Sequence, residues 1–167
     1  IEACQQGFRI VWMGFPANEA AYSFKVGVYS QILDENLDPV GDREEIIPPS
    51  QADFPLKAQC RAGGGEIILI RNSKHNADLS VDREDRVVGF DAAGRELFSN
   101  VQASPLRQLI ATSDGGYAAI DCGDRVAKYD ASGAMVWQKD FGLHSFRYDL
   151  VQEIMPTDDG GVDVLLN

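Results

Sequence analysis

The side chains that could do chemistry are few, and their spacing does not suit catalysis. The two histidines, His75 and His144, have no second ligand at the spacing of a zinc-binding helix, so both are expected to be solvated loop residues. The sequence contains no Gly-x-Ser-x-Gly nucleophile motif, no phosphate-binding Gly-x-x-x-x-Gly-Lys loop and no dinucleotide fingerprint. It therefore predicts no catalytic residue and favours a non-enzymatic protein.

Acidic residues offer the remaining chemistry. The segment 71–86 holds carboxylates that could bind calcium, namely Asp78, Asp82, Glu84 and Asp85. It lacks the alternating acids and fixed glycine of an EF-hand, and four interleaved basic side chains compete for the same carboxylates. We expect a solvated loop here and no cofactor, with calcium as the alternative. Asp114 and Asp159 precede glycine pairs, where a carboxylate usually accepts backbone hydrogen bonds of a turn.

The three cysteines, Cys4, Cys60 and Cys122, are widely spaced and odd in number. This excludes a disulfide-rich scaffold and a Cys-x-x-Cys site, but allows one bridge and a spare thiol. Cys122 follows the apolar run 117–120 and is expected to be a buried thiol.

The charge balance restricts the partners. With 15 Lys and Arg against 26 Asp and Glu, the net charge is −11, which disfavours nucleic acid and anionic membranes and favours a basic protein partner. The same charge can also serve solubility alone. No window is apolar enough for a membrane helix, so no membrane insertion is expected. The start Ile1-Glu2-Ala3-Cys4 faintly resembles a bacterial lipoprotein signal end, and we expect a periplasmic or extracellular location.

Glycine pairs mark the first of two repeated elements. Pairs within 63–70, 114–120 and 159–166 each precede a short apolar run, and another apolar stretch lies before each pair. Glycine supplies the positive φ of a tight turn, and these runs are too short for buried helices. Each copy therefore predicts a β-hairpin with a two-residue turn.

A second hairpin follows in two copies. Phe90-Asp91-x-x-Gly94 aligns with Tyr129-Asp130-x-x-Gly133, and a returning strand follows each glycine. A unit thus has four antiparallel strands, A to D. The N-terminal part is a degraded copy that supplies strands B, C and D, and the last copy supplies strands A and B. The approximate units within this single all-β domain are residues 1–49, 50–102, 103–143 and 144–167.

The two motifs together, Asp-Gly-Gly-Tyr and Tyr-Asp-x-x-Gly-x-x-x-Trp, resemble the blades of bacterial β-propellers, including quinoprotein-like ones. The resemblance is best over Ser104 to Gly142 and weak elsewhere. It implies about three and a half antiparallel four-stranded blades, a partial propeller that cannot close by itself in the conventional way. A β-sandwich is the alternative, because short strands at similar spacing occur there too.

The blade topology places the long connections, among them 15–23, 71–86 and 141–148, on one face. Because long loops on a rigid scaffold usually carry binding residues, we expect aromatic and histidine contacts with a protein partner there. The predicted contacts are Phe15, Tyr22, His75, Phe141, His144, Phe146 and Tyr148.

Three functions remain open from the sequence. The leading hypothesis is a non-enzymatic acidic protein-binding module, in a specific version an inhibitor or immunity-type protein for a basic secreted enzyme. The alternatives are a fragment of a larger propeller enzyme, quinoprotein-like or sugar-active, and a self-associating half-propeller that forms a homodimer.

Overall fold

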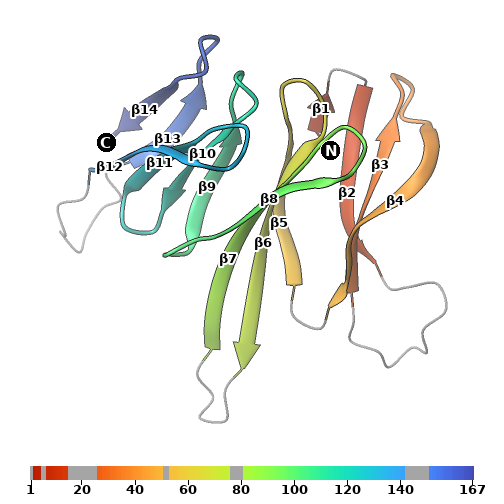
Figure 1. Cartoon of the computed structure of the whole chain (residues 1–167), viewed down its shortest axis with the longest axis horizontal. Coiled ribbons are helices and arrows are strands. Elements are labelled where there is room, and N and C mark those ends of the chain that lie inside the picture. The colour runs from red at the N-terminus through yellow and green to blue at the C-terminus, as the bar shows by residue number, and fades with distance from the viewer. Residues whose placement is uncertain (1, 5–6, 15–25, 51–52, 76–80, 142–150) are drawn as a thin grey trace.

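The computed structural model describes residues 2–4, 7–14, 26–50, 53–75, 81–141 and 151–167. These residues form strands and turns only, which confirms the predicted all-β fold class. The described residues contain no helix long and apolar enough to cross a membrane. The strands fall into four antiparallel sheets that follow one another in chain order, and none of them closes on itself (Figure 1).

Three of the sheets are four-stranded meanders, in which each strand pairs with the next along the chain. The first contains β1 (Glu2–Cys4), β2 (Gly7–Gly14), β3 (Val26–Leu33) and β4 (Pro39–Ser50). The second contains β5 (Asp53–Cys60), β6 (Glu66–His75), β7 (Val81–Phe90) and β8 (Glu96–Val101). The third contains β9 (Leu106–Ala111), β10 (Tyr117–Asp121), β11 (Arg125–Tyr129) and β12 (Met135–Asp140). The fourth sheet has two strands, β13 (Val151–Pro156) and β14 (Val162–Leu166).

The core lies between the sheets and is divided among three apolar clusters. Because side chains alternate along a strand, β6 sends Ile67 and Leu69 towards the third sheet and Ile68 and Ile70 towards the first. β10 repeats this arrangement, with Tyr117 and Ala119 packed against the second sheet and Ala118 and Ile120 against the fourth. The central strands are therefore buried on both faces, which explains why their sequences are continuously apolar.

Six of the described hairpin turns are closed by the same pair of hydrogen bonds. In the turn 112–116, the N–H of Thr112 donates to the carbonyl of Gly116 and the N–H of Gly115 donates to the carbonyl of Thr112. The same pair of hydrogen bonds closes the turns that begin at Asp34, Arg61, Asp91, Asp130 and Thr157. In five of these turns only the fourth residue has positive φ, as in a type I turn followed by a bulge residue, whereas in the turn that begins at Arg61 the three glycines 63–65 all have positive φ. The predicted two-residue turn is therefore wrong.

Only the first glycine of the pair 115–116 has positive φ, at 82°. The second is required by close packing, since a Cβ on Gly116 would lie 2.1 Å from the carbonyl oxygen of Tyr129. Both glycines are needed, but for different physical reasons.

Several other sequence predictions change. The N-terminal sheet has a first strand, β1, which the sequence pattern did not reveal. The segment predicted as a long loop over 71–86 is largely strand, because β6 continues to His75 and β7 begins at Val81. Cys122 is an exposed free thiol rather than a buried one, because it lies in the turn after β10, while Cys60 is disulfide-bonded. One bridge and one spare thiol were among the sequence-based alternatives.

Candidate functional site

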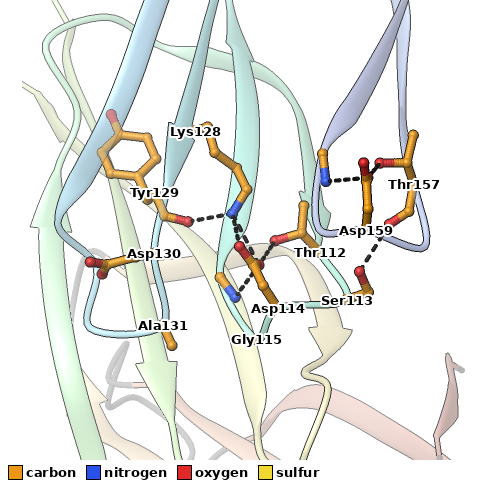
Figure 2. Close-up of polar contacts among 12 residues, drawn as sticks. Thr112, Ser113, Asp114, Gly115, Lys128, Tyr129, Asp130, Ala131, Thr157 and Asp159 are labelled. Atoms are coloured by element: carbon orange, nitrogen blue, oxygen red, sulfur yellow. Dashed lines mark hydrogen bonds and ion pairs between the residues drawn. The ribbon is translucent and has the colours of Figure 1, made fainter.

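Asp114 lies at the centre of a polar network on the turn between β9 and β10 (Figure 2). Its Oδ1 accepts hydrogen bonds from the Thr112 hydroxyl at 2.6 Å and from the Gly116 N–H at 3.1 Å. The Lys128 Nζ donates to both carboxylate oxygens, at 3.0 and 2.8 Å, and to the carbonyl of Tyr129. The amine of Lys128 is buried, whereas the Asp114 side chain is half-exposed.

Opposing effects determine the ionisation of Asp114. Burial by itself raises the pKa of the carboxyl group, but the bonds from Lys128, Thr112 and Gly116 outweigh it and lower the pKa to about 2. Asp114 is therefore ionised at neutral pH and is not suited to donate a proton as a general acid.

Asp159 occupies the corresponding place in the next turn. It accepts hydrogen bonds from the Thr157 hydroxyl and, at 3.0 Å, from the Gly161 N–H (Figure 2). These bonds lower the pKa of its carboxyl group, with the Thr157 hydroxyl contributing most. The carboxylates of Asp114 and Asp159 thus act in their turns by binding backbone and hydroxyl groups.

Two other aspartates join consecutive sheets, and the sequence did not identify them in that role. Asp85 is buried, forms a two-bond ion pair with Arg71, and accepts the N–H of Leu106, the first residue of β9, at 2.6 Å. Asp124 accepts the N–H of Val151, the first residue of β13, at 3.3 Å. Each carboxylate therefore fixes the first strand of the following sheet.

The four carboxylates considered as calcium ligands can be compared with these hydrogen bonds. Both carboxylate oxygens of Asp85 are bonded within the protein, so this residue is not a free ligand. Asp82 and Glu84 are exposed, and Asp78 lies outside the described residues. Within the described part of the chain, no cluster of three or more His, Cys, Asp or Glu residues could hold a metal ion.

A pocket of about 150 Å³ lies between the third sheet and the 101–106 connection. Its polar lining centres on Arg125, whose Nη2 lies 2.9 Å from Oδ2 of Asp121 and donates to the hydroxyl of Ser104 at 3.1 Å. The Tyr129 hydroxyl donates to Oε1 of Gln102 at 3.3 Å. The apolar lining comes from Val101, Leu106, Ala119, Ala127 and Met135.

The chemistry of this pocket suits binding better than catalysis. Burial raises the pKa of Tyr129, so its hydroxyl stays protonated at neutral pH. Asp121 is held by Arg125 and by the backbone N–H groups of Gly123 and Arg125. A cavity of this size accommodates a ring or a medium-sized side chain. The pocket can therefore seat a small group with one polar and one apolar side.

The predicted contact face can be followed at two of its residues. Phe141 is half-buried against the third apolar cluster, with the Lys139 Nζ 4.9 Å from its ring centre. The backbone of His75 ends β6 and pairs with Val81, so it belongs to a strand and not to a loop. The other predicted contacts lie outside the described residues: Phe15, Tyr22, His144, Phe146 and Tyr148.

The outer strand of the third sheet is an exposed surface that the sequence pattern does not predict. All six residues of β12 are exposed, including Met135, Val136 and Trp137. An apolar run in the last strand of a repeat looks like core in the sequence, and only the position of the strand at the sheet edge exposes it. Exposed apolar groups that cluster in this way are typical of binding surfaces.

Comparison with known proteins adds no family to these observations. No family model matches the chain, and no curated protein matches it.

Proposed function

We propose that this chain is a non-enzymatic, acidic protein-binding module built from β-propeller-type blades, and that its partner is a basic protein. The observation that carries the proposal is the exposed strand β12, which presents Met135, Val136 and Trp137 at the edge of a rigid sheet. Large apolar side chains on a scaffold supply contact area for a partner at little entropic cost.

The polar groups support binding over catalysis. The carboxylates of Asp85, Asp114, Asp121 and Asp159 serve turns, ion pairs and connections between sheets. The net charge of −11 would accelerate encounter with a cationic protein and disfavour an anionic one. The pocket beside Met135 and Gln138 could receive one partner side chain next to β12. A basic secreted enzyme that is inhibited by this chain fits these features.

The blade interpretation rests on repeated geometry. The four described sheets follow one another along the chain, and their first strands, β1, β5, β9 and β13, contact one another in order. Such stacking with the first strands adjacent is typical of propeller blades around an axis. A β-sandwich would instead pair two sheets around one core, whereas among the described residues three apolar clusters lie between the four sheets.

The test is direct binding to a panel of purified basic secreted hydrolases, with acidic hydrolases of similar size as the matched set. We expect saturable binding to at least one basic enzyme, inhibition of that enzyme, and at least about tenfold weaker binding for a Met135→Ala/Val136→Ala chain. The control is Val40→Ala, which removes a similarly exposed apolar side chain from β4. The proposal would be contradicted if the chain bound no enzyme of the panel, or if Val40→Ala weakened binding as much as the Met135→Ala/Val136→Ala change.

A second candidate function is a segment of a larger propeller, formed by one longer chain or by two self-associating chains. The observation that favours it is the two-stranded fourth sheet beside three four-stranded ones. For the two-chain form, light scattering of the purified chain should give twice the mass of one chain at every concentration. A monomer mass throughout would count against that form.

A further inference from the structure

The pocket on the third sheet has a floor of two small side chains. Ala119 of β10 pairs with Ala127 of β11, and both line the pocket of about 150 Å³. The equivalent pair in the second sheet, counted from the last glycine of each turn, is Ile68 and Val88. Ile68 and Val88 are 0% and 2% exposed and belong to an apolar cluster. The pocket therefore lies where the repeat has two methyl groups in place of two branched side chains.

A third difference from the second sheet makes this pocket polar. Asp121 lines the pocket at the position that Ile70 occupies in the second sheet, where Ile70 is buried in an apolar cluster. The Nη2 of Arg125 lies 2.9 Å from Oδ2 of Asp121 and donates to the Ser104 hydroxyl at 3.1 Å. Both contacts use one nitrogen, so within the described residues the Nε and Nη1 of Arg125 keep N–H groups for a bound acceptor.

Aromatic and amide groups form two sides of the pocket. The Tyr129 ring stacks on Tyr117 with ring centres 4.3 Å apart, and Tyr117 stacks in turn on Phe98 at 5.6 Å. Tyr129 is half-buried and lines the pocket, so a further flat ring can pack beside this aromatic group. Gln138 of β12 pairs with Ala127, and its exposed side-chain amide bonds to no described protein group. This amide offers both a donor and an acceptor to a bound molecule.

The position of the pocket is set by contacts within the chain. Its lining comes from residues 101–106, which connect the second sheet to the third, and from β10, β11 and β12. One described sheet precedes these two sheets and another follows them. A cavity of this size holds one benzene-sized ring.

We propose that this pocket binds an uncharged aromatic ring that carries one hydroxyl group, as a phenol does. The ring lies on the methyl groups of Ala119 and Ala127, beside Tyr129. Its hydroxyl oxygen accepts an N–H of Arg125, and its hydroxyl proton is donated to the amide oxygen of Gln138. An anionic ring is disfavoured by the net charge of −11. This inference goes beyond the proposed function and does not rest on it, because the ring is bound without a protein partner.

The probe is para-cresol, which is added to the full chain with isotope-labelled alanine methyl groups and followed by NMR. Binding should shift the methyl signals of Ala119 and Ala127 upfield in a saturable way, because both methyl groups lie under the face of the ring. The methyl signal of Ala118 is the internal control, since Ala118 packs on the opposite side of the sheet. Toluene lacks only the hydroxyl and should bind at least about fivefold more weakly. Absence of saturable shifts, or equal affinities for the two compounds, would overturn the proposal.

Two variants of the chain test the same site. Ala127→Val introduces the residue type that the second sheet carries at the equivalent position, fills the floor of the pocket, and should weaken para-cresol binding at least about tenfold. Gln138→Met removes the amide at similar side-chain length and should weaken para-cresol binding about threefold, with the affinity for toluene unchanged. Val136→Ala is the matched control, because Val136 follows the pocket residue Met135 without lining the pocket.

Thermal unfolding shows whether each variant is folded. If Ala127→Val does not fold, Gln138→Met decides alone, because it changes an exposed side chain. An unchanged affinity for para-cresol in the folded variants, or an equal loss in Val136→Ala, would overturn the proposal.

A phenol ring can come from a free compound or from the tyrosine side chain of a protein. N-acetyl-tyrosinamide distinguishes the two sources, because its ring is attached to a peptide backbone. An affinity equal to that of para-cresol assigns the pocket to a protein tyrosine, and at least about tenfold weaker binding assigns it to a free phenolic compound. The phenol site stands in both cases. If para-cresol binds as described and no basic enzyme does, this inference stands and the proposed function fails, and the reverse result overturns this inference alone.

Discussion

A single carboxylate, that of Asp114, serves both a turn and a buried amine. Asp114 accepts turn bonds from Thr112 and Gly116, and Asp159 accepts the equivalent bonds from Thr157 and Gly161. Of these two aspartates, only Asp114 also binds the amine of Lys128. Removal of a partner from a buried charge costs more than the pair itself contributes, because the remaining charge stays desolvated. The contribution of Asp114 therefore depends mainly on Lys128.

We expect Asp114→Asn to lower the free energy of unfolding at pH 7 by about 1–2 kcal/mol, a value reduced from that of a fully buried pair because Asp114 is half-exposed. The lowered pKa of about 2 means that this stabilisation is present above the pKa of the unfolded chain, near 4, and is lost as the pH falls towards 2. Denaturant unfolding between pH 2 and 7 measures it.

The matched control is Asp159→Asn, which changes the same turn position without a buried amine beside it. A smaller loss than for Asp114→Asn is expected, because asparagine keeps an oxygen acceptor for the turn. If both variants lower the free energy of unfolding equally at pH 7, the bond to Lys128 adds nothing to the contribution of Asp114.

At the scale of elements, the turns are also packing surfaces between sheets. Gly94 and Gly133 end equivalent motifs and have positive φ of 74° and 81°. A Cβ on Gly133 would lie 2.5 Å from Cγ of Phe98, whereas a Cβ on Gly94 would meet nothing closer than 3.7 Å. The β11–β12 turn thus packs its glycine on the preceding sheet.

We expect Gly133→Ala to destabilise the protein by about 3 kcal/mol, because it adds a steric clash with Phe98 to the cost of positive φ. Gly94→Ala bears only the cost of positive φ, about 1 kcal/mol. Thermal unfolding of the two variants measures the difference. Equal losses would show that the Phe98 contact relaxes freely and does not hold the two sheets together.

At the scale of the whole molecule, repulsion among carboxylates opposes folding. The charge of −11 is spread over exposed residues, while several ion pairs, such as Arg71 with Asp85, are shielded from solvent. Salt screens exposed charges far more than buried pairs. Screening should therefore remove more repulsion than attraction.

We expect the melting temperature to rise by a few degrees when NaCl increases from about 0.05 to 0.5 M. Calorimetry measures this shift, and Asp42→Asn/Glu45→Gln, which neutralises two exposed residues of β4, should reduce it. A melting temperature that falls with salt would mean that exposed ion pairs dominate the electrostatic balance.

Much of the fold follows from local sequence. Glycine pairs and Asp-x-x-Gly motifs predict the hairpins because positive φ and turn hydrogen bonds depend on adjacent residues, and the predicted turn roles of Asp114 and Asp159 agree with the structure. The apolar runs between them predict the strands by length and composition. These features require no knowledge of distant contacts.

Other features exist only in the tertiary structure. Lys128 reaches Asp114 across a hairpin, and Arg61 donates to the carbonyls of Gly115 and Ala131 in the next sheet, so no local pattern reveals these bonds. Phe98 and Trp137 are equivalent in the sequence, yet one is buried and the other exposed. Strands, turns and net charge can be predicted from the sequence, because they depend on adjacent residues or on a sum over all residues. Which surfaces are covered follows only from the folded arrangement, because burial depends on the sheet that packs next.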